Sequence, residues 1–112
     1  MTLPNQNPAE IAACTADADG VGTALAAYQA EHGAYPSPPA PWSAASYATN
    51  YQPLTAAGDG GPFMDSAPKT TWYVIEYDAA GQVWVAPPGA YGPYNKGQDI
   101  TITPSICEAA VG

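Results

Sequence analysis

The chain has 112 residues and a formal net charge of -8 at pH 7, because ten acidic residues outnumber its two basic ones, Lys69 and Lys96. This length fits one small domain and excludes a multi-domain enzyme with separate cofactor and substrate modules. Two lysines cannot form the basic surface that a nucleic-acid backbone or an anionic membrane requires, so neither partner is expected for this domain. No apolar run approaches the ~20 residues that cross a bilayer, and residues 1–7 lack the pattern of a signal peptide.

Aromatic residues supply much of the apolar area in this sequence. Leu, Ile, Val and Phe are scarce, whereas the chain contains 8 Tyr and 3 Trp. Each of these rings buries far more area than an alanine does. We therefore expect a folded domain whose small core consists of a few large rings in an alanine-rich background.

The two cysteines, Cys14 and Cys107, lie near opposite ends of the chain. Their separation does not resemble the clustered spacing of a zinc site, and the single histidine, His32, cannot complete one. We expect a disulfide, which in the chain-entropy model stabilises by about 4 to 5 kcal/mol when it closes a loop of nearly the whole domain. Two buried free thiols are the alternative, whereas a disulfide implies an oxidising, extracytoplasmic compartment.

A long helix is predicted at about residues 8–32. Asn7 is a suitable N-cap, Pro8 suits the first helical position, and Glu10 can reach back to the cap. Gly33 can adopt the left-handed conformation that ends a helix, and a proline follows soon after it.

Apolar residues recur in this helix at alternating spacings of three and four, which places them on one narrow face. The predicted packing stripe consists of Ile11, Cys14, Ala18, Val21, Leu25 and Tyr28. The same heptad pattern is compatible with a coiled coil, but Cys and Ala make a poor zipper. We therefore expect the stripe to pack on the protein's own sheet.

The segment 33–69 is predicted to be a long connector, because its composition changes to Pro, Ser, Ala, Tyr and Gly. The prolines at 36–41 favour extended backbone. Large apolar side chains are nevertheless spaced through the connector, so we interpret it as a loop held to the body by these anchors. They are Trp42, Tyr47, Tyr51, Leu54, Phe63 and Met64.

An antiparallel meander of three strands is predicted over residues 70–104. β-Branched and aromatic residues favour the strands, and a Gly-containing turn separates the first two. The predicted segments are a strand at 71–77, a turn at 78–81, a strand at 82–86, a third strand at 99–103 and a C-terminal tail at 105–112. One helix packed on a small antiparallel sheet is a single-domain α+β architecture.

The sequence does not predict an enzyme or a cofactor site. His32 lies at the predicted helix C-terminus, where the helix dipole favours a cation, and neither cysteine has a base nearby in sequence. Asp17 and Asp19 point to different faces of the helix, while Glu76 and Asp78 flank a hairpin. Four dispersed carboxylates offer oxygens to Ca²⁺, but Asp in Gly-rich turns is ordinary turn chemistry, so no metal site is predicted. They are Asp59, Asp65, Asp78 and Asp99.

The aromatic rings also suggest a binding module, because exposed rings stack on sugars or on partner proteins. Our main interpretation is that most of these rings form the core, because the aliphatic residues are too few to form a core without them. The rings concerned are Trp42, Tyr47, Tyr51, Trp84, Tyr91 and Tyr94. Tyr91 and Tyr94 are the candidate contact surface, because their loop has few aliphatic neighbours to bury both rings.

Several segments together resemble the type IV pilins and the pilin-like pseudopilins of type II secretion systems. The similarity covers about two-thirds of the chain and is most specific at the end of the helix. It is carried by Ala13-Cys14-Thr15-Ala16-Asp17-Ala18, Val21, Ala24, Ala27-Tyr28-Gln29-Ala30 and Gly33-Ala34-Tyr35-Pro36, and less tightly by Ser66-Ala67-Pro68, Tyr73 to Asp78 and Cys107.

The resemblance implies a non-catalytic structural subunit at the cell surface that self-associates into a filament through an apolar N-terminal helix. The present sequence lacks that helix, its cleavage glycine and the acidic residue that follows it, so we interpret the chain as the soluble head. Any membrane contact would come only through the absent helix. The alternative is a freestanding secreted module that binds a carbohydrate or a protein surface with exposed Tyr and Trp side chains.

Overall fold

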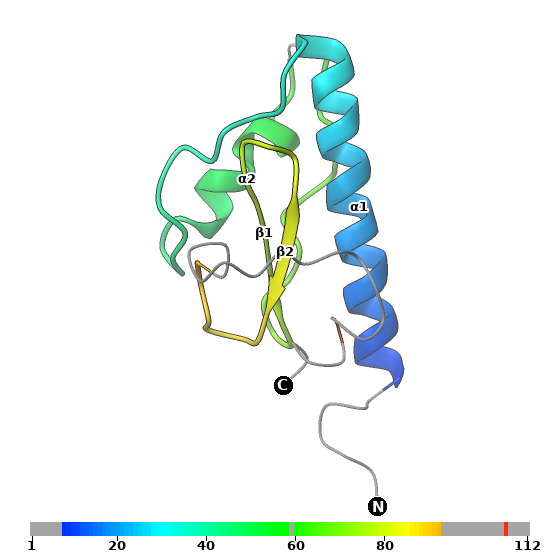
Figure 1. The fold of residues 1–112 in the computed structure, drawn as a ribbon, viewed down its shortest axis with the longest axis vertical. Helices are drawn as coiled ribbons and strands as arrows, with labels where there is room; N and C mark the ends of the chain where they lie inside the picture. The colour runs from blue at the N-terminus through cyan, green and yellow to red at the C-terminus, as the bar shows by residue number, and fades with distance from the viewer. Residues whose placement is uncertain (1–7, 59, 93–106, 108–112) are drawn as a thin grey trace, which may run out of the picture.

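The computed structural model describes residues 8–58, 60–92 and 107. Within them the chain forms a long helix α1 (Pro8–His32), a short helix α2 (Tyr47–Thr55) and the strands β1 (Val74–Tyr77) and β2 (Val83–Ala86), as Figure 1 shows. The architecture is α+β, with a long helix and a small antiparallel sheet of two strands. No helix in the described ranges is long and apolar enough to cross a membrane.

Helix α1 has the bounds that the sequence predicts. Pro8 is its first residue, where a missing backbone N–H costs no helical hydrogen bond. At the other end, Gly33 has a φ of 82°, and its N–H donates to the oxygen of Gln29 at 2.7 Å. This is a left-handed C-cap, so the last turn of α1 ends in the manner expected of glycine. The predicted N-cap, Asn7, lies outside the described residues.

The apolar stripe of α1 packs as predicted. Its residues from the second to the fifth turn are fully buried, and the two at its ends are half-buried against the same core. The buried members are Cys14, Ala18, Val21 and Leu25, and the half-buried ones are Ile11 and Tyr28. Helix α1 contacts both strands and α2, so it packs against the whole of the small sheet (Figure 1).

The two strands form a hairpin whose faces are both covered. Val74 pairs with Ala86 and Tyr77 with Val83, and every residue of both strands is buried. Strand β1 is shorter at its start than the predicted strand 71–77, because the chain reaches the sheet only at residue 74. The predicted third strand, 99–103, lies outside the described residues.

The connector 33–69 is not a plain loop, and this corrects the sequence prediction. Residues 47–55 form α2, which buries Tyr47, Asn50, Tyr51 and Leu54. Pro53 lies inside this nine-residue helix, where it lowers the local helix propensity, and no side-chain bond caps its start. The helix therefore depends on burial of its apolar face rather than on local signals.

Side chains from the connector complete the outer edge of β1. The hydroxyl of Tyr51 donates to the backbone oxygen of Ile75, and the hydroxyl of Tyr47 accepts from the N–H of Ile75 at 3.3 Å. The indole Nε1 of Trp42 donates to the backbone oxygen of Tyr77 at 3.2 Å. An edge strand normally presents such groups for pairing with another chain, and here they are already satisfied.

Candidate functional site

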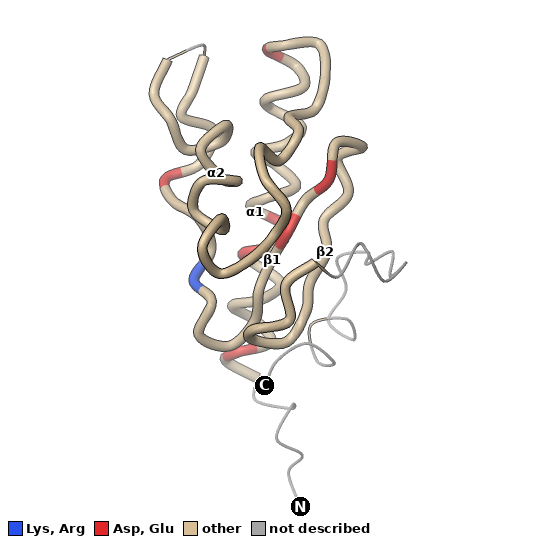
Figure 2. Tube along the Cα trace, turned by 90° about the vertical axis from the view of Figure 1, so that its left-hand side faces the viewer, with Lys and Arg blue, Asp and Glu red and all other residues tan. Residues whose placement is uncertain are grey.

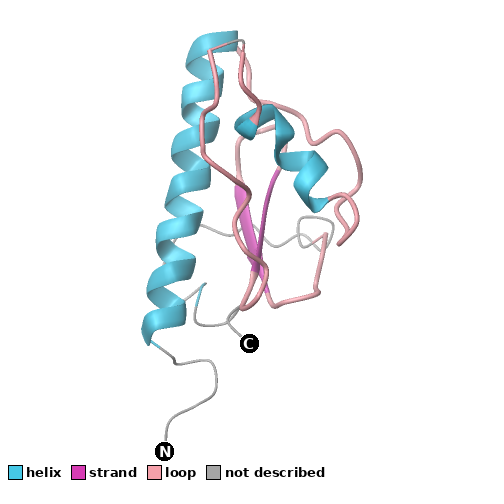
Figure 3. Cartoon of the chain, turned by 180° about the vertical axis from the view of Figure 1, so that it is seen from behind, coloured by secondary structure: helices cyan, strands magenta, loops and turns pink. Residues whose placement is uncertain are grey.

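A groove lies between α1 and the segment 64–73. That segment runs beside α1 before it enters β1, which Figure 3 shows from behind. The groove has a volume of about 560 Å³. Its wall on α1 is made of small residues, Ala13, Ala16 and Gly20, with Asp17 beside them. Open space remains at Gly20, where an added Cβ would meet no atom within 4 Å in the described structure.

Trp72 forms part of the opposite wall of this groove. It is the one large apolar residue of the described chain that is exposed, at 41% of its surface. The sequence predicts that Trp72 lies in a strand, because the run from Thr71 to Tyr77 has high strand propensity. In the structure β1 begins only at Val74, after Trp72: residues 73–77 are buried, whereas Thr71 and Trp72 face solvent. Strand propensity alone cannot distinguish these two cases, so this residue was missed.

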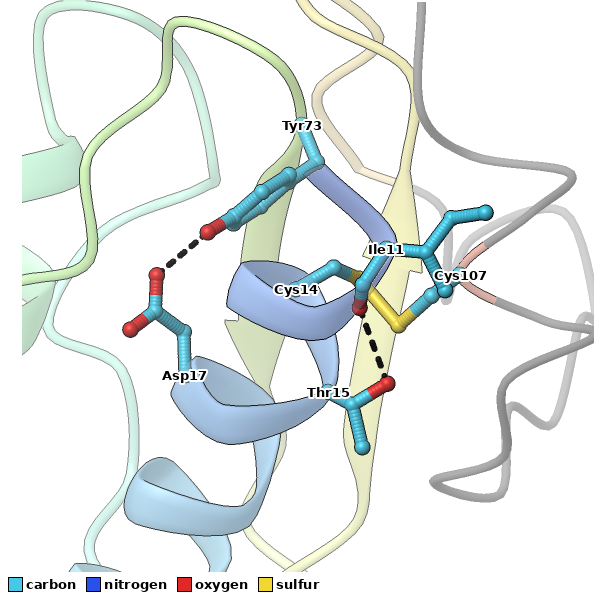
Figure 4. Close-up of a disulfide and its surroundings, with 6 residues drawn as sticks. All are labelled: Ile11, Cys14, Thr15, Asp17, Tyr73 and Cys107. Carbon is cyan, nitrogen blue, oxygen red and sulfur yellow. Dashed lines mark hydrogen bonds between the residues drawn. A yellow bond between two sulfur atoms is a disulfide. The ribbon is translucent and has the colours of Figure 1, made fainter. Parts of the chain in front are cut away.

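A hydrogen bond between two side chains joins the two walls of the groove. The hydroxyl of Tyr73 donates to Oδ2 of Asp17, which joins the start of β1 to the third turn of α1 (Figure 4). Burial raises the pKa of Tyr73, and the bond to Asp17 raises it further, because both favour the neutral phenol. The Asp17 carboxylate is thereby held in place at the wall of the groove.

Donors and acceptors are both present around the groove. Lys69 lines it and is the only lysine or arginine among the described residues, the single blue segment in Figure 2. The carboxylate of Asp17 and the hydroxyls of Ser66 and Thr71 lie in the same lining. The lining is therefore mainly apolar, with one cation, one anion and three hydroxyls, of which that of Tyr73 is already bonded to Asp17.

The predicted disulfide is present. Cys14 and Cys107 are bonded, their Cα atoms lie 5.9 Å apart, and both side chains are buried (Figure 4). The bond ties the second turn of α1 to a residue near the C-terminus, and no free cysteine remains.

Most of the aromatic rings form the core, as the main interpretation expects. Trp42 packs edge-on against Tyr47, Tyr51 and Tyr77, with ring centroids 5.5 to 5.8 Å apart. Tyr91, a candidate contact residue, is half-buried, and its ring packs edge-on against Tyr47 at 5.9 Å. The core therefore holds part of the Tyr91 ring, while the other candidate, Tyr94, lies outside the described residues.

Asp78 and Glu76, which flank the hairpin, have separate hydrogen-bond partners. Asp78 belongs to the hairpin turn: its Oδ1 accepts from the N–H groups of Ala80 and Gln82, and its Oδ2 accepts from the indole of Trp84. Glu76 is fully buried on β1, and its Oε2 accepts from the N–H of Gly92 at 2.7 Å.

No group of three metal-ligating side chains occurs within the ranges 8–58 and 60–92 together with residue 107. Of the four carboxylates considered for Ca²⁺, Asp59 and Asp99 lie outside those ranges. His32 is exposed at the end of α1, where its ring packs on that of Tyr28 with centroids 4.2 Å apart.

Comparison with known proteins returns no match. No protein-family model fits the chain, and no curated protein and no solved structure is significantly similar to it.

Proposed function

We propose that this protein is the extracytoplasmic head of a pilin-like subunit, a non-catalytic structural component of a surface filament. The observation that carries the proposal is the placement of α1. This helix of 25 residues packs one narrow stripe on the sheet, and it begins at one end of the molecule (Figure 1). A helical segment joined to that end would project away from the head, which is the arrangement a filament core needs.

The residues that end α1 also support the proposal, because they connect the helix to the hairpin. Within Gly33-Ala34-Tyr35-Pro36, the ring of Tyr35 lies against Gly81 in the hairpin turn, and Pro36 is buried. A Cβ added at Gly81 would lie 2.6 Å from this ring. The segment that most resembles pilins thus packs the hairpin turn against the chain that follows α1.

The closed edge of β1 bears on how such a subunit would assemble. Edge strands often recruit a second chain through their unpaired backbone groups. In this protein the groups at Ile75 and Tyr77 already bond to Trp42, Tyr47 and Tyr51. Self-association through a helix is therefore favoured over strand addition at β1, and the disulfide suits an extracellular filament.

The test uses cells that produce the protein naturally. Filaments are sheared from these cells, labelled with an antibody to the head and examined by electron microscopy, with a strain lacking the gene as the control. We expect label along the filaments and a subunit extended by an apolar segment of about 25 residues at its N-terminus. A protein found only in the medium, starting near Thr2 and absent from filaments, would contradict the proposal.

A freestanding secreted binding module is the second candidate function. The observation that favours it is the exposed indole of Trp72 beside the groove, because exposed apolar surface often marks a binding site. The filament experiment separates the two candidates, because a secreted module needs no subunit contacts.

A further inference from the structure

We propose that the groove between α1 and the segment 64–73 binds a neutral pyranose sugar, with the sugar ring stacked on Trp72. The inference goes beyond filament assembly and holds whether or not the protein polymerises. Its starting point is size, because the groove volume of about 560 Å³ falls in the range of small-molecule sites. A site of this volume accommodates one or two sugar rings rather than a folded partner.

The indole of Trp72 is the stacking surface. A pyranose presents a face of C–H groups, which packs on the apolar face of an aromatic ring while the sugar hydroxyls stay in water. With 41% of its surface exposed, Trp72 is accessible, unlike the other described tryptophans, Trp42 and Trp84, which are buried. The small side chains of Ala13 and Ala16 line the facing wall and leave room for a ring.

Polar groups in the lining of the groove match the hydroxyls of a sugar. The Asp17 carboxylate accepts hydrogen bonds, the Lys69 ammonium donates them, and the hydroxyls of Ser66 and Thr71 do both. Asp17 is also pre-oriented, because Tyr73 donates to one of its oxygens. A carboxylate that is already held in place loses little side-chain entropy when a ligand binds.

The charges of the groove favour a neutral ligand over a charged one. Asp17 opposes an acidic sugar, as does the net charge of -8 on the chain. Lys69 opposes a cationic ligand at the same site. A neutral polyol can use both side chains, whereas an ion would be attracted by one and repelled by the other.

The test is a titration of the isotope-labelled protein, followed by amide and indole NMR signals. The probes are glucose, galactose, N-acetylglucosamine and the β-1,4-linked dimers of glucose and of N-acetylglucosamine, up to about 50 mM, which covers millimolar dissociation constants. We expect at least one probe to shift the indole signal of Trp72 and the amides of Ala16 and Gly20 together. The absence of shifts with every probe, or shifts confined to other parts of the protein, would overturn the proposal.

Variants of Trp72 and Asp17 identify the contacts. Trp72→Ala should weaken binding at least tenfold, and Asp17→Asn should weaken it severalfold. Asp19→Asn is the matched control, since Asp19 is exposed on the same helix but does not line the groove. Equal affinity of Trp72→Ala and the unaltered protein would show that the indole does not bind the sugar.

A third variant tests the groove without changing either contact residue. Gly20→Leu adds a side chain where the structure has open space, and it replaces glycine in a helix, so the fold should be retained. We expect the added side chain to occupy the groove and to abolish the sugar-induced shifts. Thr23→Leu, at an exposed position on α1 outside the groove, should bind as the unaltered protein does. Unchanged binding by Gly20→Leu would place the ligand elsewhere.

Discussion

The hydroxyl of Tyr51 donates a hydrogen bond of 2.5 Å to the backbone oxygen of Ile75, so that a side chain of α2 completes the edge of β1. Both residues are fully buried, which means that no water can replace the bond if it is lost. Short connector helices usually contribute apolar area to a core. This one also supplies the hydrogen bonds that a neighbouring strand would otherwise provide.

Tyr51→Phe should therefore lower the free energy of unfolding by about 1 to 3 kcal/mol, because it leaves a buried carbonyl without its donor. Urea denaturation of the variant measures this loss. Tyr28→Phe is the control, since it removes the same atom from a half-buried ring on α1. Equal losses in the two variants would show that the bond to Ile75 carries no special weight.

Alkaline pH should destabilise the protein through its buried tyrosines. Burial is the main cause that raises the pKa of Tyr47, Tyr51, Tyr73 and Tyr77 above the ordinary value of about 10. Above pH 10 the unfolded chain releases phenolic protons that the folded chain retains. Stability is therefore fully present below about pH 10 and falls as pH rises, by up to about 1.4 kcal/mol per pH unit for a fully buried tyrosine such as Tyr51.

Urea denaturation at pH 8, 10 and 11 measures this effect, and phenolate absorbance reports which tyrosines ionise in the folded state. Most of the phenolate absorbance should appear at the pH at which the protein unfolds. Stability that stays constant from pH 8 to pH 11 would contradict the prediction.

Two glycines with the same backbone conformation should respond differently to alanine. Gly81 and Gly89 both have a φ of 82°, but an added Cβ at Gly81 would lie 2.6 Å from the ring of Tyr35, whereas at Gly89 nothing in the described structure lies within 4 Å. Gly89→Ala should cost about 1 to 2 kcal/mol from the left-handed backbone alone. Gly81→Ala should cost more, because the ring must also move.

The difference between these two variants isolates the contact of the hairpin turn with Tyr35. Thermal denaturation of both proteins measures it, and the double variant Tyr35→Ala, Gly81→Ala tests its origin. Removing the ring should bring the added cost of the alanine at Gly81 down to that at Gly89. A cost at Gly81 that is unchanged without the ring would refute the steric explanation.

Removal of the disulfide should be among the most destabilising changes. It joins residues separated by 93 positions, and loss of a native disulfide from a small domain typically costs about 2 to 5 kcal/mol. The paired change Cys14→Ala, Cys107→Ala is measured by urea denaturation, with mass spectrometry showing a gain of about 2 Da when the unaltered protein is reduced. Equal stability of the oxidised and doubly substituted proteins would contradict this account.

Much of the fold can be predicted from the sequence because its signals are local. Pro8, Gly33 and the three-four spacing of the apolar stripe specify both ends of α1 and the face that it buries. Asp78 and Gly81 likewise specify the hairpin turn, through side-chain acceptance and a positive φ. Each signal lies within a few residues of the structure that it determines.

Helix α2 is the clearest case in which local signals were insufficient. The spacing of Tyr47, Tyr51 and Leu54 fits a helix, but Pro53 and the surrounding Pro- and Ser-rich composition indicate a loop. Burial of that face against the sheet, with hydrogen bonds to β1, outweighs the unfavourable propensity. Those contacts are made with residues more than twenty positions away.

By itself the sequence determined the long helix, its packing stripe and the hairpin, because each depends on which residues occur a few positions apart. It also determined the one possible cysteine pair, because the chain has only two cysteines. Only the tertiary structure decided that α2 completes the edge of β1 and that Trp72 lies exposed beside a groove. Both facts depend on which distant segments lie next to each other, since burial is a property of the assembled chain and not of any single run of residues.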